Sequence, residues 1–377
     1  MNDGISNNQR VLSTEDARLL SCGHPPEHDA LARRRIRREG IYGLGETYQD
    51  GLWTCDRLDE YLTEVFRAPA PRLSPFAWSR MILAAIDKRI FNRQSGRGAF
   101  NIGERHYDLG NDLFGSMLDR SMSYTCGYWA SADSLEQAQD AKLDLICRKL
   151  GLTPGQHILD IGCGWGNFAE HAARHYGVRV TGVTVSKEQA DFARKRCEDL
   201  PVEIRLQDYR EIDGAFDHIV SIEMIEAVGR KNLPVYYQTI DRCLKDGGLF
   251  VLQVISGDTL TRHSDRRLDQ FILWLVQYIF PDGYLPRTDE ILPPRDSSLR
   301  IEDWHRFHDD YDRTLLAWAA QFNQNWEHIS DQYDERFHRR WNFYLHGCAA
   351  IFRAQLIDVS QIVYTKGQAK SRYQPVR

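Results

Sequence analysis

Paired cysteines, long apolar runs and a large excess of either charge are all missing from this sequence. Its eight cysteines form no C-x-x-C pair, which argues against a zinc site and a disulfide framework and favours a reducing compartment. The longest apolar runs, among them 81–86 and 271–276, are far shorter than the roughly 20 residues that a membrane-spanning helix needs. A net charge of −5 over 377 residues gives no general attraction to nucleic acid. The sequence therefore predicts a cytoplasmic protein whose contact with a membrane is peripheral.

Composition divides the chain into segments of different character. Between residues 29 and 92 the apolar pattern is helical, with Leu58, Leu62 and Val65 recurring at helix spacing. Glycines at 40, 43, 45 and 51 predict a connection between two helices. The predicted segments are a disordered N-terminus (1–25), a small, mainly helical N-terminal domain (26–94), a linker (95–104), a catalytic domain (105–367) and a C-terminal tail (368–377).

Two stretches are candidates for contact with a lipid surface. Arginines at 33, 34, 35, 37 and 38 form either a solvated helix face or a surface attracted to anionic headgroups, at roughly 1 kcal/mol per basic residue. The apolar run 271–276 lies beside Arg262, Arg266 and Arg267. It is an interfacial membrane element, part of a lid that packs around an acyl tunnel, or both if it lines the tunnel mouth.

From residue 135 onward, helices alternate with short apolar strands. This alternation is typical of βαβ units and predicts an α/β fold with a doubly wound, mostly parallel sheet. It stops near residue 257, and we expect a lid insertion over 257–310 because so long a connection is rarely idle. The predicted strands are 157–162, 178–184, 202–206, 216–222, 248–255 and 360–366.

A glycine-rich turn follows the first of these strands. Residues 158–166 read Ile-Leu-Asp-Ile-Gly-Cys-Gly-Trp-Gly, and glycines at 162, 164 and 166 let backbone N–H groups approach a ligand closely. A nicotinamide-binding turn is the main rival, but it needs a different glycine spacing and an acidic residue at the end of the second strand. Here that strand ends at Val183-Thr184-Val185. The turn therefore favours S-adenosylmethionine, with Thr184 or Gln189 replacing the acid that usually holds the ribose.

Further motifs surround this turn in a fixed order. They are His106–Phe114, Ser123–Trp129, Leu159–Gly166, Gly182–Ser186, Gln207–Arg210, Tyr278–Pro281, Glu302–His305 and Asp310–Asp312, with Gly43–Glu46 and Gly51–Trp53 upstream. Together they resemble the cyclopropane-fatty-acyl-phospholipid synthases over about residues 29–366. The resemblance implies a seven-stranded sheet of the class I methyltransferase type.

The resemblance also implies an activity. Members of this family transfer a methylene unit from S-adenosylmethionine to the cis double bond of an unsaturated acyl chain in a phospholipid. The alkene attacks the sulfonium methyl group, and a bound bicarbonate ion then removes a proton from the carbocation so that the ring closes. A homodimer that associates peripherally with the inner face of the membrane is also implied.

The resemblance assigns the reacting end of the site. Glu226 is the carboxylate that hydrogen-bonds bicarbonate and accepts the proton, and Tyr311 donates its hydroxyl to the same anion. Cys126 and Ile255 contribute backbone groups rather than side chains. Gln253 stands where well-known bacterial members have histidine, and Glu223 and Ala227 differ from those members too. The combination is similar to the plant-type branch.

The same resemblance assigns the cofactor residues. Asp160 fits either the cofactor's amino group or the geometry of the turn. The methionine end falls to Tyr107, Tyr124 and Thr125, the carboxylate or ribose to Gly162 and Gly164 within the turn that ends at Gly166, the ribose to Thr184, Val185 and Gln189, and the adenine to Gln207 and Asp208.

Other outcomes remain open at this point. An acyl-chain or natural-product C-methyltransferase would use the same cofactor without closing a ring, and a non-catalytic lipid-binding protein would keep only the fold. No metal is expected, although His305 and His308 lie near Asp309 and Asp310, because Arg306 is adjacent. The aromatic residues that are either cation-stabilising or plain core are Tyr124, Tyr128, Trp129, Tyr278, Phe280 and Tyr311.

Overall fold

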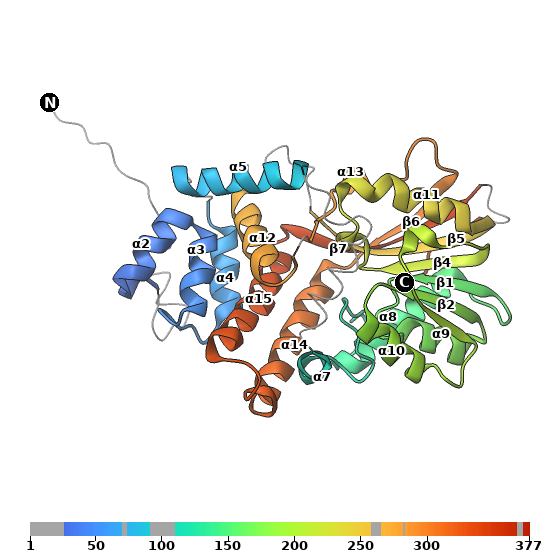
Figure 1. The fold of residues 1–377 in the computed structure, drawn as a ribbon, viewed down its shortest axis with the longest axis horizontal. Coiled ribbons are helices and arrows are strands. Elements are labelled where there is room, and N and C mark those ends of the chain that lie inside the picture. Colours follow the sequence, from blue (N-terminus) through green and yellow to red (C-terminus); the bar gives the residue numbers. More distant parts are fainter. Residues whose placement is uncertain (1–25, 70–73, 91–109, 258–264, 282, 368–371) are drawn as a thin grey trace.

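A seven-stranded sheet forms the centre of the computed structural model (Figure 1). The structure describes residues 26–69, 74–90, 110–257, 265–281, 283–367 and 372–377. The strand order is β3-β2-β1-β4-β5-β7-β6, in which the first five are parallel and β7 runs antiparallel to both β5 and β6. This confirms the predicted fold class. The strands are β1 (His157–Ile161), β2 (Arg179–Thr184), β3 (Val202–Leu206), β4 (Phe216–Ile222), β5 (Leu244–Gly257), β6 (Leu299–Arg306) and β7 (Ile357–Lys366).

Helices cover both faces of this sheet. Because successive residues of a strand point to opposite faces, Ile158 packs against α8 and α9, whereas Leu159 packs into the cluster that contains α11. Ser134 begins α8 by accepting a hydrogen bond from the Gln137 N–H, and Gly151 ends it in the left-handed conformation. The helices are α8 (Leu135–Leu150), α9 (Asn167–Tyr176), α10 (Lys187–Arg196) and α11 (Leu233–Cys243), with short turns η2 (Tyr209–Glu211), η3 (Ile225–Ala227) and η4 (Arg230–Asn232).

The segment predicted as a lid insertion is partly sheet. It contains α12 (Arg266–Tyr278) and α13 (Thr288–Ile291), but residues 299–306 form β6, which pairs with β7. The prediction that the insertion extends to residue 310 is therefore wrong at its C-terminal end. Charged side chains along this edge strand hide it from an analysis based on apolar pattern.

A helical layer lies beside the sheet (Figure 1). The N-terminal helices share one apolar core with α12, α14 and α15, through Trp53, Phe66, Trp274 and Phe343 among others. The domain boundary at residue 94 stays a prediction, and residues 1–25 and 95–104 lie outside the described residues. The elements are η1 (Pro26–His28), α2 (Ala30–Glu39), α3 (Ile41–Gln49), α4 (Leu58–Arg67), α5 (Pro75–Ile90), α7 (Asn111–Met117), α14 (His308–Ile329) and α15 (Glu335–Arg353).

Of the four glycines that predicted a connection, Gly40 and Gly51 lie between helices, but the other two lie inside one. Gly43 and Gly45 are both within α3. A Cβ atom at Gly45 would lie only 2.7 Å from ring atoms of Phe343 and Trp274. The glycine is thus needed because α3 packs closely against α12 and α15, a reason that local sequence does not reveal.

The apolar run 271–276 is largely core. Phe271 and Trp274 are fully buried, and the Trp274 ring lies 4.9 Å from that of Phe343 between ring centres. The run therefore packs against the other helices through Phe271 and Trp274, and its interpretation as a membrane element stays a prediction. No helix among the described residues is long and apolar enough to cross a membrane.

Two further features concern the state of the cysteines and the position of the C-terminal residue. Six described cysteines are buried and free, while Cys55 is disulfide-bonded, which departs from the expectation of reduced thiols at that position. The final residue, Arg377, pairs through its guanidinium with the Asp303 carboxylate on β6. The tail thus ends against the sheet.

Candidate active site

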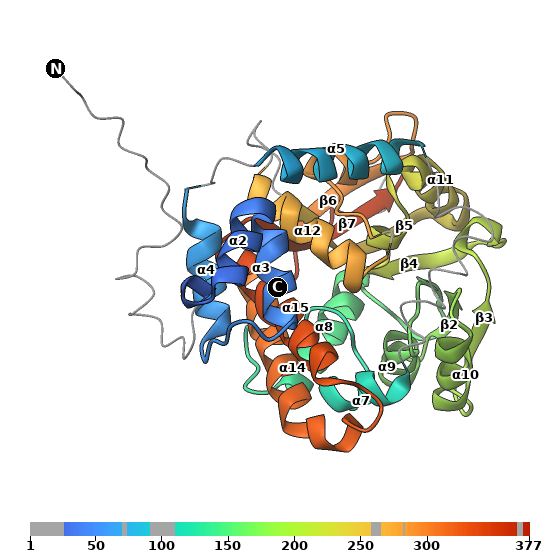
Figure 2. The ribbon, with the colours of Figure 1, turned by 60° about the vertical axis from the view of Figure 1, so that its left-hand side comes forward.

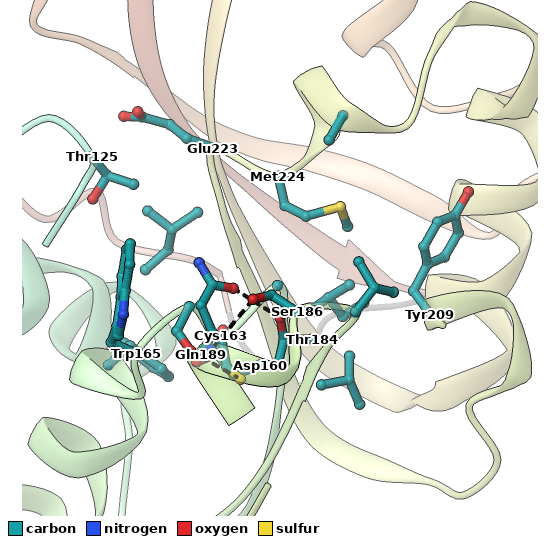
Figure 3. A pocket seen from close by; sticks show the side chains of 18 of the residues that line it. Thr125, Asp160, Cys163, Trp165, Thr184, Ser186, Gln189, Tyr209, Glu223 and Met224 are labelled. Carbon is teal, nitrogen blue, oxygen red and sulfur yellow. Dashed lines mark hydrogen bonds between the residues drawn. The ribbon is translucent and has the colours of Figure 1, made fainter. Parts of the chain in front are cut away.

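A cavity opens at the carboxyl ends of β1, β2 and β4 (Figure 3). Gly162, Gly164 and Gly166 adopt φ angles of 83°, 53° and 83°, which L side chains rarely adopt. A Cβ atom at Gly162 would lie 2.5 Å from the Met224 Cγ, whereas one at Gly164 would meet nothing within 4 Å. The turn therefore presents bare backbone to open space at the sheet edge where ligands bind in such folds.

Gly166 does a different job from its two neighbours. It is not part of the cavity lining, and a Cβ there would lie 2.9 Å from the Ala193 Cβ of α10. The structure thus gives Gly166 a packing role at the start of α9, and its assignment as a cofactor contact stays a prediction. Tyr107, the other assigned residue that is missing from the lining, lies outside the described residues.

One wall of the cavity is a polar network at the end of β2 (Figure 3). The Thr184 hydroxyl donates to Gln189 Oε1 at 2.9 Å, and the Ser186 N–H donates to Thr184 Oγ1 at 3.2 Å. The Gln207 N–H donates to the Thr184 carbonyl at 2.9 Å, which brings Asp208 to the same wall. These contacts put the residues assigned to ribose and adenine on one cavity, and Val185 lines it as well.

Asp160 carries an unsatisfied carboxylate oxygen into the same cavity. The side chain is buried, and Oδ2 has no hydrogen-bond partner among the described residues. Burial raises the pKa of Asp160 to about 7, although the nearby Lys142 ammonium lowers it. A buried acceptor without a partner costs about 1–3 kcal/mol, so this oxygen favours a cationic ligand. The observation fits the amino group of S-adenosylmethionine and favours that interpretation over turn geometry.

Lys142 is a residue that the sequence analysis missed. It lies on the buried face of α8, lines the cavity and donates from Nζ to the Thr125 hydroxyl at 2.9 Å. Burial lowers the pKa of this ammonium. A lysine among the apolar positions of helix 135–150 was the signal that was available in the sequence.

Glu223 is the centre of the reacting end, just beyond β4. Its carboxylate is directed toward the side of the cavity where Thr125 lies (Figure 3). Oε1 accepts from the Cys126 N–H at 3.0 Å and from Gln253 Nε2 at 2.7 Å, and Oε2 accepts from the Tyr311 hydroxyl at 2.6 Å. Burial raises the pKa of Glu223, and these three donors oppose that rise.

Glu226 lies nearby on η3 in a different environment. Its Oε1 accepts from the Ile255 N–H at 2.6 Å, while Oε2 has no hydrogen-bond partner among the described residues. Burial, followed by the charge of Glu223, raises the pKa of Glu226 to about 8. The structure therefore brings Ile255 to Glu226 but brings Cys126, Gln253 and Tyr311 to Glu223.

The resemblance expects bicarbonate to use these donors. In the structure a protein carboxylate already accepts from Cys126, Gln253 and Tyr311, so the residues present do not fit a bound bicarbonate in this arrangement. Tyr311 correspondingly donates to Glu223 rather than to an anion shared with Glu226. Burial also raises the pKa of the Cys126 thiol far above its usual value, which keeps the sulfur a poor nucleophile.

An aromatic wall adjoins the two carboxyl groups. The Tyr124 hydroxyl pairs with that of Tyr344 at 2.7 Å, and the Tyr124 ring lies 5.2 Å from that of Trp318. Tyr311 stacks on Phe352 with 4.5 Å between ring centres. Of the other predicted aromatics, Phe280 joins this wall through Tyr344, whereas Tyr128, Trp129 and Tyr278 contact His305, Arg313 and Trp274, respectively.

Metal ligands are not assembled in the part of the chain that the structure describes. There, no three His, Cys, Asp or Glu side chains gather around a common point. His305 pairs through Nδ1 with Lys149 Nζ at 3.1 Å, and His308 Nε2 lies 3.1 Å from an Asp309 carboxylate oxygen. The two histidines therefore have separate partners.

Comparison with known proteins identifies the family. The family model for mycolic acid cyclopropane synthetase matches residues 94–362. The chain is 46% identical over 334 residues to the cyclopropane-fatty-acyl-phospholipid synthase of Escherichia coli K12, covering 89% of this chain and 85% of that protein. It is 35% identical over 350 residues to the tuberculostearic acid methyltransferase UfaA1 of Mycobacterium tuberculosis, covering 88% of this chain and 80% of that protein.

A solved structure agrees with the sequence matches. The mycolic acid cyclopropane synthase CmaA1, complexed with SAH (S-adenosylhomocysteine) and CTAB, superimposes with a TM-score of 0.67 and 32% identity. The match covers 71% of this chain and 98% of that one. Since the family model matches well over half of the sequence, the chain belongs to the mycolic acid cyclopropane synthetase family, whose members include S-adenosylmethionine-dependent methyltransferases.

Proposed function

We propose that this protein is a cyclopropane-fatty-acyl-phospholipid synthase. One observation carries the proposal: the cavity that holds the unsatisfied carboxylate oxygen of Asp160 is also lined by the Glu223 carboxyl group and by Tyr124 of the aromatic wall. When bound, the cofactor supplies an electrophilic methyl group. The chain's own residues would hold its amino group at Asp160, exclude water with the aromatic wall, and accept a proton at a carboxylate.

The aromatic wall suits the intermediate of such a reaction. Methyl addition to a double bond leaves a carbocation on the acyl chain, and ring faces stabilise a cation without reacting with it. Tyr124, Trp318 and Tyr311 offer such faces close to Glu223. The identity of the base is the finer part of the proposal. The resemblance names bicarbonate, which would first have to displace Glu223 from its donors.

Product analysis tests the proposal directly. The purified protein is incubated with S-adenosylmethionine and vesicles of an unsaturated phospholipid, and the acyl chains are examined by mass spectrometry and proton NMR. Addition of one carbon with loss of the double bond and appearance of ring protons is the expected result. Retention of an alkene in the enlarged chain would contradict ring closure.

A fatty-acyl C-methyltransferase is the second candidate. The relative UfaA1 is named as a methyltransferase rather than as a synthase of rings. This chain also has Gln253 and Glu223 at positions where it differs from well-known bacterial ring-forming members. In the same assay this activity would give a methylene-branched or methyl-branched chain without ring protons.

Peripheral membrane binding is part of the proposal, and we place it on α2 and α5. Trp78, Ile82 and Leu83 on α5 are 42%, 51% and 65% exposed. Exposed arginines of α2 lie beside α5, and the Arg38 guanidinium lies 3.9 Å from the centre of the Phe76 ring. Both views of the fold place α5 along the outer side of α12 (Figures 1 and 2). Apolar groups beside basic ones are the chemistry of an anionic bilayer surface.

Vesicle sedimentation tests this surface. The double variant Ile82→Ser, Leu83→Ser should lose binding to anionic vesicles, and Val235→Ser on α11, which is 40% exposed, serves as the matched control. Equal binding by both variants would contradict the assignment. The cytoplasmic location and the homodimer implied by the resemblance stay predictions, and analytical ultracentrifugation tests the dimer.

A further inference from the structure

The Glu223 carboxylate accepts the hydrogen bonds that the resemblance assigns to a bound bicarbonate ion. The resemblance implies that Cys126, the residue at position 253 and Tyr311 hold a bicarbonate ion. In this chain the same three residues donate to the Glu223 carboxylate, at 3.0, 2.7 and 2.6 Å. A carboxylate and a bicarbonate ion are both planar oxyanions that accept one proton. The protein thus carries, as a side chain, the functional group that the resemblance expects as a bound ion.

Two departures from the bacterial pattern are in direct contact. The resemblance marks Glu223 and Gln253 as departures from the bacterial members, and Gln253 Nε2 donates to Glu223 Oε1 at 2.7 Å. Gln361 on β7 donates to Gln253 Oε1 at 2.9 Å, which turns the amide so that its N–H₂ group faces Glu223. The two substitutions therefore form one arrangement, in which an amide that cannot titrate supports a carboxylate that can.

The backbone at Glu223 is held in an uncommon conformation to achieve this. Its φ angle is 51°, in the left-handed region that costs an L side chain about 1–2 kcal/mol. The Glu223 N–H donates to the Gln253 carbonyl at 2.8 Å, which fixes the residue at the end of β4. Strain of this kind, at a residue that lines the cofactor cavity, is typical of a functional position.

Glu223 and Glu226 are neighbouring carboxyl groups in different environments. Three donors stabilise charge on Glu223, whereas Glu226 has one donor and an oxygen without a hydrogen-bond partner in the described residues. Two neighbouring carboxyl groups in such different environments titrate apart. The pair is therefore expected to carry its charge on Glu223 and its proton on Glu226.

We infer that the Glu223 carboxylate is the base of the reaction and that the chain needs no bicarbonate. This inference rests on the proposed function and names the proton acceptor within it. The π electrons of the acyl double bond form a bond to the methyl carbon, and the S–CH₃ bond breaks with its electron pair going to sulfur. Glu223 then takes one proton from the new methyl group, and that C–H electron pair closes the ring at the cationic carbon. The carboxyl group afterwards releases its proton to solvent.

The first test removes bicarbonate from the wild-type protein. Turnover is measured with unsaturated phospholipid vesicles in buffer freed of carbon dioxide, and again after bicarbonate is added back. We expect equal rates in the two conditions. A wild-type rate that depends on bicarbonate would overturn the inference.

The second test changes Glu223 itself. Glu223→Gln keeps the shape and the acceptor oxygen but removes the base, so turnover should fall by about 10²-fold or more while cofactor affinity by calorimetry stays near that of wild type. The control Glu198→Gln changes an exposed carboxylate beyond α10 and should behave as wild type. Wild-type turnover by Glu223→Gln would overturn the inference.

In the variant Glu223→Gly, turnover should come to depend on added bicarbonate. A variant that is merely damaged would not show this dependence. Glycine is suited to the φ of 51°, and its small size leaves the three donors open. Added bicarbonate should restore turnover to this variant, and more strongly when it is combined with Gln253→His. Failure of bicarbonate to restore any turnover, with cofactor binding intact, would count against a shared anion site and overturn the inference.

Binding of isotopically labelled bicarbonate gives a readout that does not need activity. Labelled bicarbonate should give no bound NMR signal with wild type and a bound signal with Glu223→Gly. If wild type forms no ring on phospholipid, the proposed function fails, but these two spectra still decide whether Glu223 occupies the anion site. A bound signal in wild type would overturn the inference even if the proposed function holds.

Discussion

At the glycine-turn end of the cavity, Asp160 has a carboxylate oxygen without a hydrogen-bond partner among the described residues, whereas at the other end Glu223 receives three donors. Asp160 is buried and Glu223 is half-buried, and both line the same cavity. An unsatisfied buried carboxylate is costly, so Asp160 gains from a cation that binds there. Burial raises the pKa of Glu223, and its three hydrogen-bond donors oppose that rise by stabilising the anion. The Asp160 end of the cavity is therefore suited to binding a cation, whereas at the Glu223 end the carboxylate already has its hydrogen-bond donors.

Removing the charge at Asp160 tests the ligand-binding end and should give the largest effect. Asp160→Asn is expected to weaken cofactor binding roughly 10²-fold, because losing one partner of a buried charge pair costs about 2–5 kcal/mol. Calorimetric titration with S-adenosylmethionine measures the change. The free energy of unfolding of the apo protein should not fall, since the variant removes a buried, incompletely paired carboxylate. Unchanged affinity would assign Asp160 to turn geometry alone.

The pH dependence of cofactor binding sharpens the same point. The pKa of Asp160 is raised to about 7 by burial, and only its ionised form attracts an ammonium group. Below pH 7 the bound cofactor must displace a proton, so affinity should fall about tenfold for each further pH unit. Above pH 7 it should be constant. Asp160→Asn should remove this pH dependence. A wild-type affinity that stays constant from about pH 5 to about pH 8 would contradict the prediction.

Loss of the Tyr311 hydroxyl should change the pKa of Glu223, and the pH dependence of turnover should show this change. Tyr311→Phe removes a hydrogen bond to a charged group, worth about 1.5–3 kcal/mol, which corresponds to about 1–2 pKa units. The pKa of Glu223 should rise by that amount, because its anion loses a donor. The acid limb of the rate profile should therefore move to higher pH, with turnover about tenfold lower at any pH on that limb. Tyr344→Phe, which removes a hydroxyl that pairs with Tyr124, should leave the acid limb in place.

How far the sequence predicted these two ends follows from the range of their contacts. The glycine turn and the Thr184–Gln189 pair are local, so residues within a short segment predicted that end well. The three hydrogen bonds to Glu223 join residues 97, 30 and 88 positions away in the chain. The role of Glu223 could therefore not be predicted from nearby residues. The only signal in the sequence was that positions 223 and 253 both depart from the bacterial members of the resembled family. Gly45 and β6 were misread for the same reason, since distant packing and pairing determine both.

Neutralising Glu226 permanently should have a smaller effect than changing Glu223. The pKa of Glu226 is raised to about 8, so its carboxyl group is mostly neutral at pH 7, and glutamine keeps an oxygen for the Ile255 N–H. Turnover of Glu226→Gln should stay within about tenfold of wild type at neutral pH. A change in the wild-type profile near pH 8 should be absent from the variant. A loss of 10²-fold or more would make Glu226 the proton acceptor, as the resemblance implies, and Glu223 its neighbour.

Replacing Gln253 by histidine should produce the smallest effect. A neutral imidazole has one donor and one acceptor nitrogen, so it can donate to Glu223 and accept from Gln361, which are the two roles of the Gln253 amide. Turnover should fall only a few-fold, roughly, because Glu223 retains all three donors. The weaker contact from Gln253 Nε2 to the Cys126 carbonyl, at 3.3 Å, is the one that histidine cannot also make. Complete inactivation would show that this second amide N–H holds the Cys126 backbone in place. The three hydrogen bonds to Glu223 would then not be sufficient for turnover.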